Sequence, residues 1–207
     1  MSGPDEADPG NPFSARRLCP GASPYLFPPG QDIATLLARL RQNDWWGQII
    51  GVHGSGKSSL LAMLIPAISK EGRQVRLVEL HDGQRKLPPE IYRRGVVLPE
   101  SVLVVDGYEQ LSRWSRLRTR QYCRRLPCGL IVTAHAPVGL PDLFRTSPTL
   151  EAVRELVVQL LEGRPMPWSV QELSDRFERH RGNVRELLFE LYDLYEAHLC
   201  RPRRRDS

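Results

Sequence analysis

Apolar residues along the chain follow two spacings, which predict strands and helices that alternate in the first part of the sequence. Four short, nearly continuous apolar runs are typical of strands buried on both faces. They lie at 45–52, 74–80, 101–107 and 129–135. Helical spacing of apolar residues predicts helices at 32–43, 57–72 and 109–125. Asp32 is a candidate N-cap of the first helix, and Gly72 stands where the second is expected to end.

After about residue 148 only the helical spacing remains. The residues that form one apolar stripe are Val153, Leu156, Val157, Leu160 and Leu161. Ser169 and Glu172 form a capping-box pair at the start of a second helix, and 183–199 is a third amphipathic helix. We therefore expect four parts: a disordered N-terminus (1–12), an α/β core with an N-terminal arm (13–147), a small all-helical lid (148–200) and a basic tail (201–207).

Composition adds limits to this picture. The chain has 207 residues, 41% hydrophobic and 26% charged, which is sufficient to bury a core. No apolar run approaches the ~18 residues that a membrane span requires. The acidic, Pro- and Gly-rich start "MSGPDEADPGNPF" is unlike a signal peptide, and the four cysteines lack the spacing of zinc ligands or of a disulfide framework. We expect a cytoplasmic protein with no membrane segment.

The segment "GVHGSGKSSLL", residues 51–61, contains the pattern G-x-x-x-x-G-K-[ST]. Its glycines let several backbone N–H groups point at one anion, beside a helix N-terminus whose dipole favours negative charge. Lys57 is expected to reach the β- and γ-phosphates of ATP, and the Ser58 hydroxyl to ligate Mg²⁺. The predicted nucleotide-binding residues are Gly51, His53, Gly54, Ser55, Gly56, Lys57, Ser58 and Ser59. With a strand before it and a helix after it, this P-loop predicts a three-layer α/β P-loop NTPase core with a parallel sheet.

Two further strand ends carry candidate site residues. "SVLVVDG" places Asp106 at the end of an apolar strand, where a Walker B aspartate holds Mg²⁺ together with Ser58. "GLIVTAH" ends in Thr133 and His135. A polar residue at the tip of a strand between those of the P-loop and Asp106 commonly senses the γ-phosphate, and we assign that role to Thr133. His135 alone is more often structural.

The P-loop, "LVVDG" and "VTAH", in this order, resemble the core of AAA-type ATPases. "RGNVREL", residues 181–187, resembles the sensor-2 segment of AAA+ lids, which implies that Arg185 contacts the γ-phosphate. "NPFSARRLCPGASPYLF" is similar to the arm that precedes the P-loop in AAA ATPases of the general-secretion and transposition type, where it lies near the adenine. Arg145 stands near the arginine-finger position of such families, although we favour a plain surface arginine.

Arginine dominates the basic residues and gives the chain a net charge of +5. "SRWSRLRTRQYCRR" sets six arginines of 113–125 around Trp114 and Tyr122, and 201–205 adds four more. Such residues suit a nucleic-acid backbone, and an acidic protein partner equally well. We favour a solvated helix face with both aromatic residues packed inward.

Hydrolysis of ATP depends on the residue that follows Asp106. The AAA-type ATPases that the chain resembles usually place a glutamate there as general base, whereas this chain has Gly107. Glu109 lies two residues further, where we expect its carboxylate to face away, and Glu79 at the end of the second strand is the other candidate. Loss of a general base costs about 10²–10⁴-fold in rate. The sequence therefore predicts tight Mg·ATP binding and slow hydrolysis.

Three functions fit these motifs. The first is an ATP-dependent switch or weak ATPase that acts on a protein or nucleic-acid partner, as a monomer or an oligomer. The second is a small-molecule or nucleoside kinase, with Glu79 or Asp82 as its base. The third is a static nucleotide-binding scaffold. The "GNVREL" segment favours the first over the second.

Overall fold

The computed structural model describes residues 10–14 and 25–199. Five parallel strands form one sheet in the order β2-β3-β4-β1-β5. Their bounds are β1 Trp46–Ile50, β2 Val75–Glu79, β3 Val102–Asp106, β4 Gly129–Ala134 and β5 Asp142–Arg145. Strand β4 lies between β1 and β3, so Thr133 stands between the P-loop strand and the Asp106 strand, as predicted.

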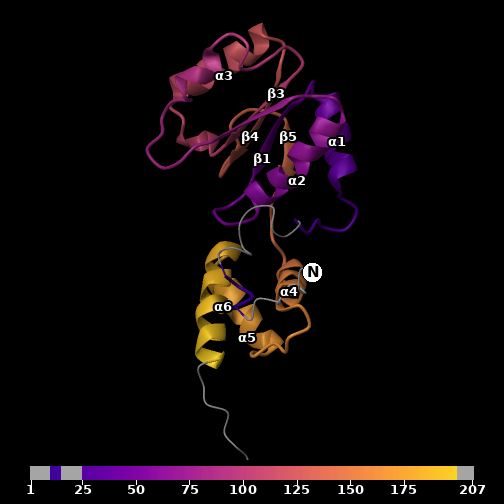
Figure 1. Ribbon diagram of the computed structural model, residues 1–207, viewed down its shortest axis with the longest axis vertical. Helices are drawn as coiled ribbons and strands as arrows, with labels where there is room; N and C mark the ends of the chain where they lie inside the picture. Colours follow the sequence, from indigo (N-terminus) through magenta and orange to yellow (C-terminus); the bar gives the residue numbers. More distant parts are fainter. Residues whose placement is uncertain (1–9, 15–24, 200–207) are drawn as a thin grey trace, which may run out of the picture.

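Helices cover both faces of the sheet and give the predicted three-layer core (Figure 1). Helices α1 (Ile33–Gln42) and α2 (Lys57–Lys70) pack with the strands around one apolar cluster that includes Leu60 and Ile131. Helix α3 (Arg113–Arg125) packs on the other face with Leu103 and Leu130. Alternate residues of β3 and β4 point into opposite clusters, because successive side chains of a strand alternate between faces.

Three details of the core differ from the sequence prediction. Strand β5 was not predicted, because it has four residues and only Leu143 and Phe144 are buried. The prediction of a fully buried β2 was wrong, because β2 is an edge strand in which Val78 alone is buried. The predicted helix at 109–125 is two elements: a 3₁₀ turn, η2 (Tyr108–Gln110), and then α3, which begins after its N-cap Ser112. A second 3₁₀ turn, η1, covers Pro89–Tyr92.

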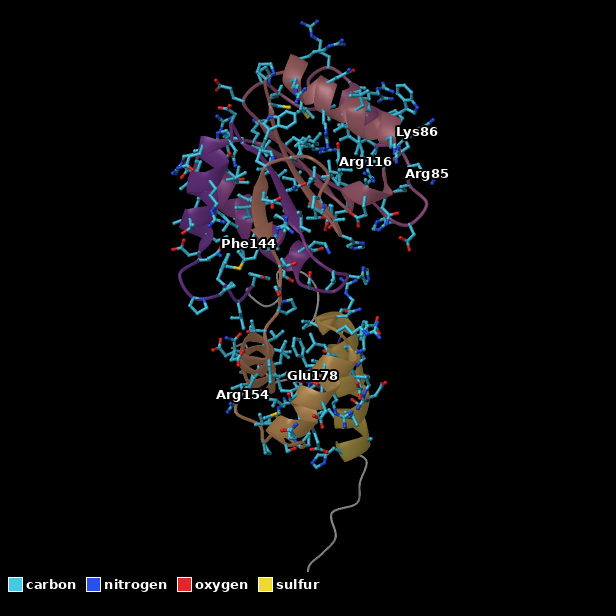
Figure 2. All side chains as sticks on the ribbon, turned by 180° about the vertical axis from the view of Figure 1, so that it is seen from behind. Arg85, Lys86, Arg116, Phe144, Arg154 and Glu178 are labelled. Carbon is cyan, nitrogen blue, oxygen red and sulfur yellow. The ribbon has the colours of Figure 1, made fainter. Side chains whose placement is uncertain are left out.

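The remaining helices form a separate bundle at the end of the molecule away from α3 (Figure 1). They are α4 (Leu150–Leu161), α5 (Val170–Arg179) and α6 (Val184–Leu199). The capping box of Ser169 and Glu172 has both of its hydrogen bonds, and the bundle core is built from apolar residues of all three helices. In Figure 2, Arg154 and Glu178 mark this bundle, whereas Phe144 belongs to the sheet of the core.

The start of the chain packs against this bundle. Phe13 is fully buried and contacts the rings of Trp168 and Tyr195, with centroids 5.7 and 5.9 Å away. The Asn11 amide donates to the Tyr192 carbonyl at 2.9 Å. Residues 1–9 of the predicted disordered N-terminus, and the tail 201–207, lie outside the described residues. Residues 11 and 12, however, are buried, so the prediction of disorder through residue 12 was wrong there.

No helix in the described part of the chain combines the length and the hydropathy needed to cross a bilayer.

Candidate nucleotide-binding site

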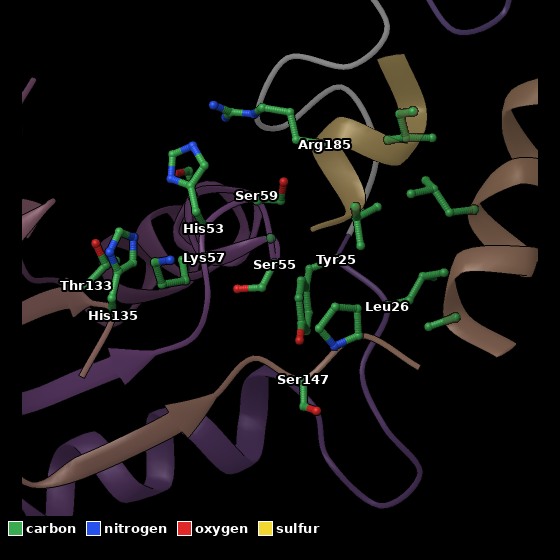
Figure 3. A pocket seen from close by; sticks show the side chains of 18 of the residues that line it. Tyr25, Leu26, His53, Ser55, Lys57, Ser59, Thr133, His135, Ser147 and Arg185 are labelled. Carbon is green, nitrogen blue, oxygen red and sulfur yellow. The ribbon is translucent and has the colours of Figure 1, made fainter. Parts of the chain in front are cut away.

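A cavity of about 1400 Å³ opens between the carboxyl ends of the strands and the helical bundle. Its wall comes from the P-loop, the ends of β2, β3 and β4, residues 25–29, and helices α4 and α6. In Figure 3, Thr133, His135 and His53 lie on one side of the P-loop, with Tyr25 and Leu26 on the other. The cavity thus has a polar end and an apolar end.

The P-loop has the backbone shape that its glycines predict. Gly54 and Gly56 have φ angles of +70° and +91°, in the left-handed region that favours glycine. Gly56 is also the N-cap of α2, so the free N–H groups of the first helical turn lie at the loop. A Cβ atom at Gly51 would collide with Thr146, whose hydroxyl oxygen is 2.6 Å from Ser55 Oγ. Thr146 therefore supports the loop, a role that the sequence did not suggest.

Lys57 does not project freely into the cavity. Only 9% of the residue is exposed, and its Nζ donates to the carbonyl oxygens of Gly51 and Val52, both at 2.8 Å. Burial lowers the pKa of Lys57, whereas the nearby carboxylates of Glu109 and Asp106 oppose that shift. The ammonium group is thus held inside the loop by the carbonyl oxygens of its first two residues.

Ser58, Asp106 and Thr133 form a hydrogen-bonded chain at the ends of β3 and β4. The Ser58 hydroxyl donates to Asp106 Oδ2 at 2.7 Å. The Thr133 hydroxyl donates to Asp106 Oδ1 and accepts the N–H of Gly107 at 2.9 Å. The structure therefore brings together a hydroxyl and a carboxylate, the hard oxygen donors that suit Mg²⁺.

Glu109 lines the cavity, so the expectation that its carboxylate faces away was wrong. Gly107 has a φ of +80°, and the 3₁₀ turn that follows carries Glu109 back toward β4. Glu109 Oε1 is 3.4 Å from His135 Nε2, and Glu109 Oε2 is buried without a hydrogen-bond partner. The His135 ring lies against that of His53, with centroids 5.8 Å apart. Sequence reasoning had left His135 without a role.

Helix α6 reaches the P-loop through its first turn. Arg185 lines the cavity, and its positive charge lowers the pKa of Lys57, although less than burial does. A Cβ atom on Gly54 would collide with the Asn183 amide and would lie 3.2 Å from Arg185 Cβ. The lid residues 183 and 185 therefore lie against the P-loop, and Figure 3 shows Arg185 at the cavity. The sequence analysis missed Asn183 because a sequence does not show which residues of the lid contact the core.

The arm divides between two places. Its "NPF" part packs into the helical bundle, as described above, and not beside the cavity. The expectation that the arm lies near a nucleotide base applies instead to residues 25–29, which line the cavity. Tyr25 Cε2 would be 3.0 Å from a Cβ on Gly56, and Tyr25 meets the ring of Phe27 edge to face at 5.2 Å. Burial raises the pKa of Tyr25 to about 12, so its hydroxyl stays protonated at neutral pH.

Of the remaining candidates, Glu79 and Asp82 line the cavity, whereas Arg145 and the aromatic residues of α3 do not. Arg145 pairs with Asp142 at 2.7 Å, and 59% of its side chain is exposed. Glu79 and Asp82 line the cavity rim, and Asp82 accepts from the Gln110 amide at 3.1 Å. On α3, Tyr122 packs against Tyr92, but Trp114 is 82% exposed, so the expectation that both aromatic residues pack inward was wrong for Trp114.

Comparison with known proteins supports the fold. No protein-family profile matches the chain, and no curated protein shows significant similarity. Among solved structures, the chain is similar to replication initiator DnaA bound to AMPPCP and single-stranded DNA, with a TM-score of 0.55 and 15% identity. This likeness supports the fold, a P-loop α/β core with a parallel sheet.

The match covers 83% of this chain and 63% of the DnaA chain, so it spans less than two thirds of that protein. The C. elegans PCH-2 structure is a weaker match, with a TM-score of 0.42 and 12% identity over 79% of this chain and 67% of that one. The predicted α/β class and parallel P-loop core are confirmed.

Proposed function

We propose that this protein binds ATP with Mg²⁺ between its core and its helical lid, and that it acts as a nucleotide-dependent switch with slow hydrolysis. The observation that carries this proposal is the meeting of Lys57, the Ser58–Asp106 pair and Arg185 at one cavity. These residues come from the P-loop, β3 and the lid, and together they provide cations and hard oxygen ligands at the end of a helix that favours anions.

The residues present fit both groups. The loop N–H groups and Lys57 would hold the β- and γ-phosphates, and Ser58 and Asp106 would hold Mg²⁺. The bound metal ion would supply positive charge that offsets the charge of the phosphates. Tyr25 and Phe27 offer aromatic faces at the apolar end of the cavity, which suit an adenine ring.

Signalling by the proposed switch depends on the lid. Arg185 and Asn183 lie at the P-loop, and Arg185 lines the cavity, so we propose that a γ-phosphate held by the loop contacts Arg185. An ADP-bound site would lack that contact. The lid would then differ between the two nucleotide states, and a partner protein or nucleic acid would detect the difference.

Slow hydrolysis follows from the turn at Gly107. A glutamate at 107 would have to adopt a φ of +80°, and its Cβ would lie 3.0 Å from the Leu80 carbonyl oxygen. The first acidic residue after Asp106 in the sequence is instead Glu109, whose carboxylate faces His135. We propose that Glu109 accepts the proton of the attacking water, with less favourable positioning than a glutamate directly after Asp106 would have.

A turnover assay separates this proposal from the kinase and the static scaffold. ADP and inorganic phosphate are measured with Mg·ATP alone, and again with a panel of nucleosides and small alcohols as acceptors. We expect slow release of phosphate that no acceptor changes. ADP that forms only with an acceptor would show a kinase, for which Glu79 and Asp82 are the candidate bases. Tight binding without any product under single-turnover conditions would show a static scaffold.

A further inference from the structure

Helix α3 exposes two large apolar side chains on the outer face of the core. Trp114 is 82% exposed and Leu117 is 47% exposed. The two residues are three positions apart, so they lie on the same side of the helix. Neither is needed for the packing of α3, whose buried side is Ser115, Thr119 and Cys123. An adjacent exposed tryptophan and leucine form an apolar patch that folding does not use.

Arginines surround this apolar pair. The sequence contains no Asp or Glu between Glu109 and Asp142, so the whole of α3 lacks acidic residues. The exposed arginines of the helix are Arg113, Arg118, Arg124 and Arg125. None of them takes part in an ion pair among the described residues. We call Trp114, Leu117 and these four arginines the α3 surface.

Basic residues before the helix extend this charge. Arg85 and Lys86 are exposed, and the Arg85 carbonyl accepts the N–H of Ser112, the N-cap of α3, at 3.0 Å. Figure 2 shows Arg85 and Lys86 beside the Arg116 end of the helix, far from the lid residues Arg154 and Glu178. The positive surface is thus longer than the helix itself.

Two of the arginines are held in place by aromatic rings. The Arg118 guanidinium carbon lies 4.2 Å from the centroid of the Tyr92 ring, and that of Arg124 lies 5.7 Å from the Trp46 ring. Such contacts already restrict the arginine side chains before a partner binds, so binding costs less conformational entropy. They leave the guanidinium N–H groups free to donate hydrogen bonds.

We propose that the α3 surface docks an acidic segment of a partner protein, one that presents carboxylates around an apolar side chain. Guanidinium groups match carboxylates with paired hydrogen bonds, and Trp and Arg are the residues most enriched at protein-binding hot spots. A nucleic acid would use the arginines and could stack on Trp114, but its sugar-phosphate backbone offers nothing apolar to cover Leu117. The apolar pair therefore favours a protein.

The α3 surface also connects to the proposed catalytic segment. Arg116, one turn after the start of α3, donates to the Glu109 carbonyl at 2.7 Å and to the Leu111 carbonyl at 2.9 Å. A segment docked on the α3 surface would lie beside Arg116, and a shift of Arg116 would move the backbone of Glu109. This coupling rests on the proposed ATPase function, whereas the docking itself does not.

Binding is tested without nucleotide, so a failure of the proposed ATPase function would not affect the result. The probes are three labelled molecules: a helical peptide of about 16 residues with Glu around a Leu and Phe stripe, the same peptide with Gln in place of Leu and Phe, and a thymidine oligonucleotide of similar charge. Fluorescence anisotropy measures each against wild type, Trp114→Ser/Leu117→Ser, and Arg113→Gln/Arg118→Gln. Arg154→Gln, at an exposed position of the lid, is the control.

We expect the acidic amphipathic peptide to bind best, and both double variants to weaken it by about tenfold or more while Arg154→Gln does not. Both substituted pairs are exposed, so circular dichroism should show unchanged folding. Tighter binding of the oligonucleotide, with loss on Trp114→Ser/Leu117→Ser, would overturn the proposal in favour of nucleic acid. Equal binding of the two peptides, or no binding of any probe, would overturn it as well.

Discussion

Glu109 Oε1 lies 3.4 Å from His135 Nε2 at one wall of the cavity, where Glu109 belongs to the turn after β3 and His135 directly follows the neighbouring strand β4. No other acid of the cavity has a histidine beside it among the described ion pairs. The pair brings a carboxylate and an imidazole close to the carboxylate that pairs with Ser58. It is the arrangement on which the proposed hydrolysis depends.

Glu109→Gln should lower phosphate release by about 10²–10⁴-fold and leave ATP affinity nearly unchanged, because the amide cannot accept a proton. Glu79→Gln is the matched control, since Glu79 lines the same cavity from β2 and is not expected to contact the attacking water. Single-turnover phosphate release measures both variants. A larger loss for Glu79→Gln would assign the base to Glu79.

Arg185→Ala should leave ADP affinity nearly intact and remove much of any preference for ATP, because the side chain is proposed to contact the γ-phosphate alone. Titration with ADP and with a non-hydrolysable ATP analogue gives the two affinities. Arg154→Ala is the control, because it removes one positive charge from the lid at an exposed position of α4. Equal losses for both nucleotides would speak against a γ-phosphate sensor.

Phe13→Ala should lower the free energy of unfolding of the lid by about 3–5 kcal/mol, because it leaves a cavity beside Trp168 and Tyr195. Phe189→Ala, at a position that is 47% exposed, should cost much less. Urea denaturation followed by the fluorescence of the tryptophans compares the two. Similar small losses would mean that the "NPF" segment does not hold the lid in solution.

Glu190 should make the lid sensitive to acid. Burial would raise its pKa, but hydrogen bonds from His180 and Arg176 and the charge of Arg179 outweigh this and place the pKa below its ordinary value of 4.5. The stabilisation is present above the unfolded value of 4.5 and is lost as pH falls through the lower folded value. The stability difference between wild type and Glu190→Gln should therefore be largest near neutral pH and shrink below pH 4.5. Urea titrations between about pH 3 and 7 measure it, and a difference independent of pH would contradict the assignment.

The sequence contains enough to predict the core and much of the site. The apolar runs predicted β1, β3 and β4 because buried parallel strands are apolar throughout, and they also located β2, although it is an edge strand with Val78 alone buried. The P-loop pattern implies its own strand and helix. The strand order explains why Thr133 meets Asp106. These features depend on neighbours in the chain, or on the rule that the carboxyl ends of parallel strands share one edge.

Features that depend on long-range contacts could not be predicted. Phe13 packs against residues more than 150 positions away, and nothing in "NPF" indicates that partner. The direction of the Glu109 side chain depends on the left-handed backbone conformation of Gly107. A glycine in the sequence permits that conformation but does not require it. Strand β5 is short and half exposed, so its pattern resembles a loop.

The central claim is that the cavity at Lys57 binds Mg·ATP, and equilibrium binding of a fluorescent ATP analogue to wild type and Lys57→Ala tests it most directly. Wild type should bind tightly, with an affinity that falls when Mg²⁺ is chelated. Lys57→Ala should lose measurable binding while its circular dichroism stays that of a folded protein, although its loop loses the hydrogen bonds to Gly51 and Val52. Undiminished binding by the folded variant would contradict the account.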